Sequence, residues 1–182
     1  MGAILLQFST CATSWQSTMI RKLCHSPFSH VDVVLADGGM LGASGSPEVP
    51  VIEGNPDGVA VRAPDYQEFG IRRRATVRLP DGVDRKFIDL VRTQMGKPFD
   101  DSALYEFFDD FEDPRDWRQP DKWFCSELFT WALERAGAFP YDLLIPKNRV
   151  SPADLLLLLN PVIETKTFWD PIPGLKMGRY EK

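Results

Sequence analysis

The segment Asp121–Gly137, DKWFCSELFTWALERAG, joins an aromatic run to an amphipathic stretch, and a single cysteine lies at the junction. Apolar residues recur there at helical spacing, which predicts a helix from about Cys125 to Ala136 that ends at Gly137. The unpaired N–H groups in the first turn of a helix lower the pKa of a thiol and can hold an oxyanion. A cysteine beside two aromatic residues is nevertheless more often a packing residue, so the helix alone does not decide its role.

A cysteine nucleophile needs a base, and the chain has two histidines, His25 and His30. His30 begins a strand-like run at 28–35, FSHVDVVL, that ends at the turn signal Asp37-Gly38-Gly39. Alternation along a strand puts Asp32 on the face of His30, where a carboxylate can orient an imidazole. A lone strand histidine is also often a hydrogen-bonded structural residue. His25 follows a predicted helix in a polar connection and is interpreted as a surface residue.

The remaining pattern predicts one α+β domain. Strands are predicted at 4–8, 40–44, 58–64 and 73–80, and helices at about 13–23, 81–96 and 151–159. Residues 45–58 are rich in Gly, Pro, Asn and Asp and predict a loop, whereas residues 97–122 are irregular, aromatic and acidic. This order predicts an antiparallel sheet packed against helices, with no linker that divides the chain.

Composition excludes several classes of function. A chain of 182 residues with 43% hydrophobic and 26% charged residues is ordinary for a soluble globular domain. The formal net charge of −5 argues against nucleic-acid binding, and the cluster Arg72–Arg74 is interpreted as a solvated strand edge. The apolar runs Ala3–Leu6 and Leu155–Leu159 are too short for a secretory signal or a membrane span. We therefore expect no integral membrane segment and a product that is cytoplasmic when synthesised.

The three cysteines, Cys11, Cys24 and Cys125, are odd in number and irregular in spacing, unlike a disulfide framework or a zinc site. Cys11 also precedes a helix, so Cys11 with His30 is an alternative catalytic pair. Cys24 lies at a helix end, where the dipole disfavours a thiolate, and is predicted to be structural. The acidic stretch 99–116 lacks the ligand spacing and glycine of a calcium loop and is predicted to be a surface loop beside the cleft.

Two segments together resemble a known family. FSHVDVVLADG at 28–38 and WFCSELFTWALERAG at 123–137 resemble the circularly permuted branch of the NlpC-type, papain-like cysteine hydrolases. In that branch, which includes YiiX-like and lecithin–retinol acyltransferase-like proteins, the histidine strand precedes the cysteine helix. DGVAVR at 57–62, MGKPFD at 95–100 and RVSPADLL at 149–156 are similar to further elements of the family. The resemblance covers roughly residues 3–160.

The resemblance implies a papain-like fold of the permuted NlpC type, with Cys125 as the nucleophile and His30 as the general base and acid. In acyltransferase-like members a second polar residue, often histidine, lies about twelve positions after the catalytic histidine. It ends the return strand, the strand that follows the histidine strand, which is predicted here at 40–44. Here Gly42 stands at that position. Asp32 is then the preferred orienting group and Ser44 the alternative, and a site without such a group would be weak or degenerate. The candidates for the oxyanion hole or the cleft are Ser126, Trp123 and Ser44.

For function, the resemblance implies a cysteine peptidase or amidase that cleaves an amide bond through a Cys–His thioester mechanism, with no metal or cofactor. The implied substrate is a peptide or a peptidoglycan stem peptide, and a bacteriophage tail or virion role follows by analogy. A catalytically weak structural module of a larger assembly and a lipid acyltransferase or thioesterase are the alternatives. We assign 1–160 to the hydrolase domain. Residues 161–182, with three prolines, form an extended arm that folds over the domain or docks on a partner.

Overall fold

The computed structural model describes residues 1–11, 13–46, 49–102, 119, 121–140, 143 and 150–163. It is an α+β fold in which six strands form one sheet in the order β4-β5-β3-β2-β1-β6, and every neighbouring pair is antiparallel. The strands are β1 (Gly2–Cys11), β2 (His30–Val34), β3 (Met40–Gly45), β4 (Val51–Gly54), β5 (Asp57–Arg62) and β6 (Phe69–Leu79). The predicted α+β class, with an antiparallel sheet packed against helices, is confirmed.

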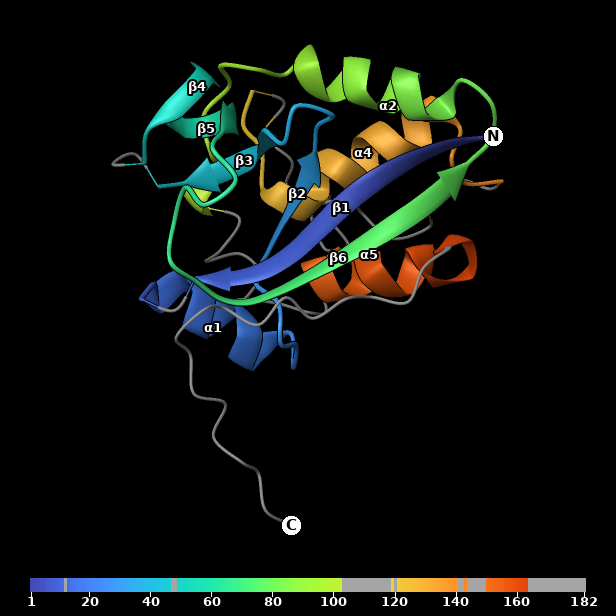
Figure 1. Ribbon diagram of the computed structural model, residues 1–182. Coiled ribbons are helices and arrows are strands. Elements are labelled where there is room, and N and C mark those ends of the chain that lie inside the picture. The colour runs from blue at the N-terminus through green and yellow to red at the C-terminus, as the bar shows by residue number, and fades with distance from the viewer. Residues whose placement is uncertain are drawn as a thin grey trace.

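Four α-helices lie within the described residues: α1 (Trp15–Leu23), α2 (Val83–Arg92), α4 (Cys125–Ala136) and α5 (Pro152–Leu159). A short 3-10 helix, η2 (Asn160–Val162), follows α5. Helix α4 packs against α2 and against β2 and β3, so the cysteine helix lies directly on the histidine strand (Figure 1). None of the helices in the described part of the chain has the length and apolar character needed to cross a membrane.

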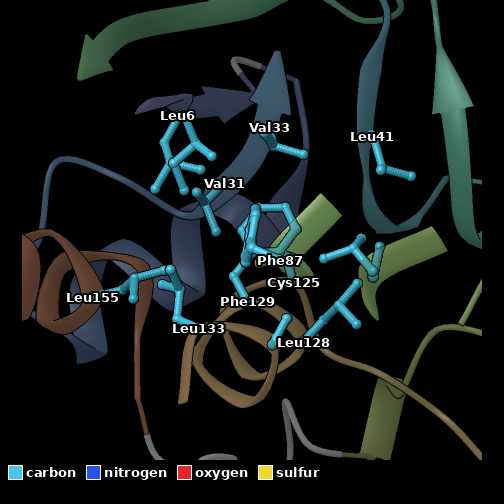
Figure 2. Packing of buried hydrophobic residues seen from close by; sticks show 14 of the residues in the cluster. Leu6, Val31, Val33, Leu41, Phe87, Cys125, Leu128, Phe129, Leu133 and Leu155 are labelled. Atoms are coloured by element: carbon cyan, nitrogen blue, oxygen red, sulfur yellow. The ribbon is translucent and has the colours of Figure 1, made fainter. Parts of the chain in front are cut away.

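The main core fills the space between one face of the sheet and the helices. Alternate residues of the central strands, among them Leu6, Val31 and Val33, pack with apolar residues of α2 and α4 (Figure 2). Each such leucine, valine or phenylalanine contributes roughly 1.5–3 kcal/mol when fully buried. Because neighbouring residues of a strand face opposite sides, His30 and Asp32 lie on the other face of β2.

That second face carries a smaller apolar cluster, formed by Met40, Tyr66 and Phe69. Tyr66 lies within the connection between β5 and β6, and Phe69 is the first residue of β6. Both are buried, with exposed fractions of 8% and 6%. The connection therefore shields the polar residues of β2 on this face from water.

Two stretches differ from the sequence-based expectation. Residues 45–58, predicted as a loop, contain β4, which is largely exposed and lacks a buried face. It forms because its backbone pairs with β5, a partner that no local pattern reveals. Strand β6 is longer than predicted and lies at the sheet edge, as the cluster Arg72–Arg74 suggested, yet these three arginines are only partly exposed. The predicted arm beyond residue 163 and most of the acidic stretch lie outside the described residues.

Candidate active site

A cleft lies where the N-terminus of α4 meets α1 and the central strands. It is lined by Cys125 and Phe124 from the start of α4, His30 from β2, Ser44 from β3 and Ser17 from α1. The structure therefore brings Cys125 and His30, which are far apart in the sequence, into one cleft.

Local interactions fix the start of α4. A carboxylate oxygen of Glu127 accepts a hydrogen bond from the backbone N–H of Phe124 at 3.3 Å, which holds the residue before Cys125 against the first turn. The Ser126 hydroxyl donates to the Val150 carbonyl at 2.6 Å, tying the first turn to the residue before the α5 cap. Cys125 lies between them in the cleft wall, and its exposed fraction is 0%.

His30 is held from both sides. Its Nε2 lies 2.9 Å from the Tyr66 hydroxyl oxygen and 3.1 Å from Oδ2 of Asp32. Cys125 lies close enough to the imidazole for its charge to raise the pKa of His30. Since Nε2 is occupied by Tyr66 and Asp32, Nδ1 is the ring nitrogen left for the thiol. A thiol, an imidazole and an orienting carboxylate in this order can perform nucleophilic catalysis.

The charges around the imidazole favour its protonated form. Burial alone would lower the pKa of His30, but the negative charges of Asp32 and Cys125 and the hydrogen bonds to both outweigh burial. Together they raise the pKa of His30 from 6.5 to about 10. A protonated imidazole beside a thiol favours the reactive thiolate, and it has a proton to give to a leaving group.

This raised pKa predicts a pH-dependent stability. Folding raises the pKa of His30, so its stabilising contribution is fully present below the unfolded value of 6.5 and is lost as pH rises through about 10. We expect the free energy of unfolding, measured by urea denaturation, to fall across this range more steeply in the wild type than in His30→Gln. Comparing the two proteins cancels the contribution of other groups that titrate in the same pH range. Parallel curves for the two proteins would show that folding does not raise the pKa of His30.

The polar group that lies beside His30 comes from β2 and not from the neighbouring strand β3. A Cβ atom built on Gly42 would lie 2.5 Å from Oδ1 of Asp32, so the carboxylate fills the space next to the glycine. The family resemblance places a polar side chain at this position of the return strand. Here the carboxylate of Asp32, from the histidine's own strand, lies next to that position instead. The catalytic role of Asp32 stays a prediction.

Sequence reasoning missed Tyr66. Its hydroxyl donates to Oδ2 of Asp32 at 2.9 Å in addition to its contact with His30. Burial, reinforced by the charge of Asp32, raises the pKa of Tyr66 well above its usual value, so the phenol keeps its proton. The surrounding sequence, APDYQEF at 63–69, reads as an ordinary turn, and no spacing rule connects it to a histidine 36 residues earlier.

The three further candidates differ in position. Ser44 lines the cleft. The Ser126 hydroxyl is engaged with Val150, and the Trp123 indole N–H donates to the Gln94 side chain at 3.1 Å. Among the residues that the structure describes, neither Ser126 nor Trp123 lines the cleft. A role for them in holding an oxyanion stays a prediction.

The other two cysteines have different surroundings. Burial is the main cause that raises the pKa of Cys24 to about 11; the charges of Asp154 and Cys125 add to it, against a hydrogen bond with Ser151. This agrees with the predicted structural role, because a thiol with such a pKa is almost entirely protonated near neutral pH. Cys11 lines the same cleft as Cys125 and is partly exposed, so it remains the alternative nucleophile.

Comparison with known proteins gives a distant likeness. No protein-family description and no curated protein matches the chain. Among solved structures, the chain is similar to the metalloprotein yiiX from Escherichia coli O157:H7, with 19% identity, a TM-score of 0.47, and coverage of 93% of this chain and 88% of that one. A YiiX-like likeness thus agrees with the sequence resemblance, but at this distance it says nothing about chemistry. In the described part of the chain, no three His, Cys, Asp or Glu residues are grouped to hold a metal ion.

Proposed function

We propose that the protein is a cysteine hydrolase with a papain-like fold of the permuted NlpC type, and that it cleaves an amide bond. One observation carries the proposal: Cys125 and His30 line one cleft, where the charge of Cys125 acts on the imidazole, and Asp32 contacts Nε2 of the ring. The family resemblance in the order of the two motifs supports the same reading.

The reaction divides into two steps. The Cys125 thiolate attacks the amide carbonyl carbon, the His30 imidazolium gives its proton to the amide nitrogen, and the C–N bond breaks to leave a thioester and a free amine. Water then attacks the thioester carbonyl and gives one proton to His30. The C–S bond breaks, which releases a carboxylic acid and restores the thiolate and the imidazolium.

The polar side chains of the cleft lining are suited to a peptide substrate. Besides the catalytic pair and three apolar residues, Ile20, Phe99 and Phe124, the lining is rich in hydroxyl and amide side chains, such as Ser14, Gln16 and Gln67. Such groups suit the hydrogen bonds of a peptide backbone. Peptidoglycan stem peptides are the substrate that the resemblance suggests, and a phage tail or virion role rests on analogy alone.

Digestion of purified peptidoglycan fragments, followed by mass spectrometry, tests the proposal. We expect new amine and carboxyl ends at one peptide bond, which are lost in Cys125→Ala. Cys11→Ser is the matched control because Cys11 lines the same cleft, and it should leave cleavage intact. Loss of cleavage in Cys11→Ser with retention in Cys125→Ala would transfer the nucleophile to Cys11. Hydrolysis of acyl esters or thioesters, with every peptide left intact, would instead support the lipid-directed alternative.

A further inference from the structure

The Tyr66 hydroxyl completes a closed set of contacts with His30 and Asp32. Its oxygen lies 2.9 Å from Nε2 of His30 and 2.9 Å from Oδ2 of Asp32, while Nε2 and Oδ2 are 3.1 Å apart. A phenol has one proton, and an ionised carboxylate can only accept. The proton therefore goes to Asp32, and the phenol oxygen accepts from His30, which requires a proton on Nε2.

Asp32 depends on this contact for its orientation. The carboxylate is fully buried, and its Oδ1 has no hydrogen-bond partner among the described residues. Its orientation therefore depends on the contacts of Oδ2, which go to Tyr66 and His30. Without the phenol, Oδ2 would keep only its contact with His30, and the ring of His30 itself needs to be oriented.

Tyr66 is itself fixed in place. Its ring meets the edge of Phe69, with centroids 5.3 Å apart and planes at 86°. The Arg62 guanidinium lies 5.5 Å from the ring centroid. Arg62 is fully buried and is anchored by the carbonyls of Gly42, Pro56 and Gly58, at 3.1, 3.0 and 2.8 Å. The phenol thus rests on a rigid support that includes the glycine next to Asp32.

We propose that Tyr66 is a positioning residue, whose hydroxyl bridges Asp32 to His30, keeps the proton on Nε2 and thereby directs Nδ1 at Cys125. The catalytic meaning of this role rests on the proposed hydrolase function. Tyr66 is not one of the described residues that line the cleft, so it acts through His30 and Asp32 and not on the substrate.

Nitrogen NMR of ¹⁵N-histidine-labelled protein tests the bridge without any substrate. The chain has two histidines, and exposed His25 serves as the internal reference. In Tyr66→Phe we expect the Nε2 signal of His30 to move, because it loses a hydrogen-bond partner, while the His25 signals stay unchanged. Phe69→Leu is the packing control: it removes the ring contact but keeps the hydroxyl, and should lower the melting temperature with a much smaller effect on Nε2. An unmoved His30 signal in Tyr66→Phe would overturn the proposal.

The alkylation rate of Cys125 by a small neutral reagent then shows whether Tyr66 acts through Asp32. Tyr66→Phe should slow alkylation by about tenfold or more, as expected when a hydrogen bond to a charged group is lost. If the phenol acts through the carboxylate, Cys125 should be alkylated only slightly more slowly in the double variant, Tyr66→Phe with Asp32→Asn, than in Asp32→Asn alone. Fully additive effects would contradict the bridge.

Failure of this inference and failure of the proposed function give different results. A wild-type protein that cleaves no amide, but whose His30 signal moves in Tyr66→Phe, would retain the bridge and reject the hydrolase. An active wild type with an unmoved signal in Tyr66→Phe would retain the hydrolase and reject the bridge.

Discussion

The thiol of Cys125 should be alkylated by iodoacetamide near neutral pH at least about 100-fold faster than that of Cys24, because of the two only Cys125 lies at a helix N-terminus and in a cleft with a histidine. Cys125 lies at the N-terminus of α4 and in the same cleft as His30, whose raised pKa keeps the imidazole protonated. A helix N-terminus and a neighbouring cation are both typical surroundings of reactive cysteines. Cys24 follows the C-terminal end of α1, and burial is the main cause that raises its pKa to about 11. Mass spectrometry of the labelled peptides gives each rate.

His30→Ala should reduce the alkylation rate of Cys125 by roughly 100-fold, in line with the usual contribution of a positioned acid–base group. His25→Ala is the matched control, because it removes the other histidine, which is exposed and does not line the cleft that the structure describes. Cys11 tests the alternative pair: if Cys11 reacts fastest and His30→Ala slows only that reaction, Cys11 is the nucleophile. Equal rates for all three thiols, unaffected by His30→Ala, would identify Cys125 as a packing residue and end the hydrolase proposal.

Local sequence patterns were sufficient for the elements that carry the candidate pair. The apolar spacing of α4 and its terminating glycine predicted the helix, and this placed Cys125 in the first turn. Period-two alternation in β2 predicted that His30 and Asp32 share a face, and their 3.1 Å contact agrees with it. Residue order, read through the family resemblance, then suggested that the helix and the strand face one cleft.

The rest depends on contacts between distant parts of the chain. Tyr66 reaches His30 because the connection between β5 and β6 folds over the second face of the sheet, where it packs with Met40. No periodicity encodes that packing. The role of Gly42 was likewise hidden, because a glycine in a strand indicates either a weak point or a close approach, and the sequence does not say of what. The structure shows that the approaching group is the Asp32 carboxylate.

Asp32→Asn should reduce turnover by about 10³- to 10⁴-fold while the protein stays folded, because the amide has the same size but lacks the charge that stabilises an imidazolium. The charge of Asp32 is the first of the causes that raise the pKa of His30 above its ordinary value. Without it, burial should dominate, so the pKa of His30 should fall well below 10, and NMR titration of the labelled histidine measures this directly. Ser44→Ala is the control and should keep nearly wild-type rates. The opposite pattern would assign the orienting role to β3.

Gly42→Ala tests the same carboxylate from the neighbouring strand. The added methyl group would lie 2.5 Å from Oδ1 of Asp32, which is closer than real Cβ contacts allow, so the carboxylate must move. We expect turnover to fall roughly tenfold or more, with the melting temperature lowered by only a few degrees. Because the methyl group acts by displacing the Asp32 charge, Gly42→Ala should add little to the loss in Asp32→Asn, where that charge is already gone. If the two losses of turnover multiply in the double variant, Gly42 acts independently of Asp32. The space beside Gly42 would then not be what lets the Asp32 carboxylate take the orienting role.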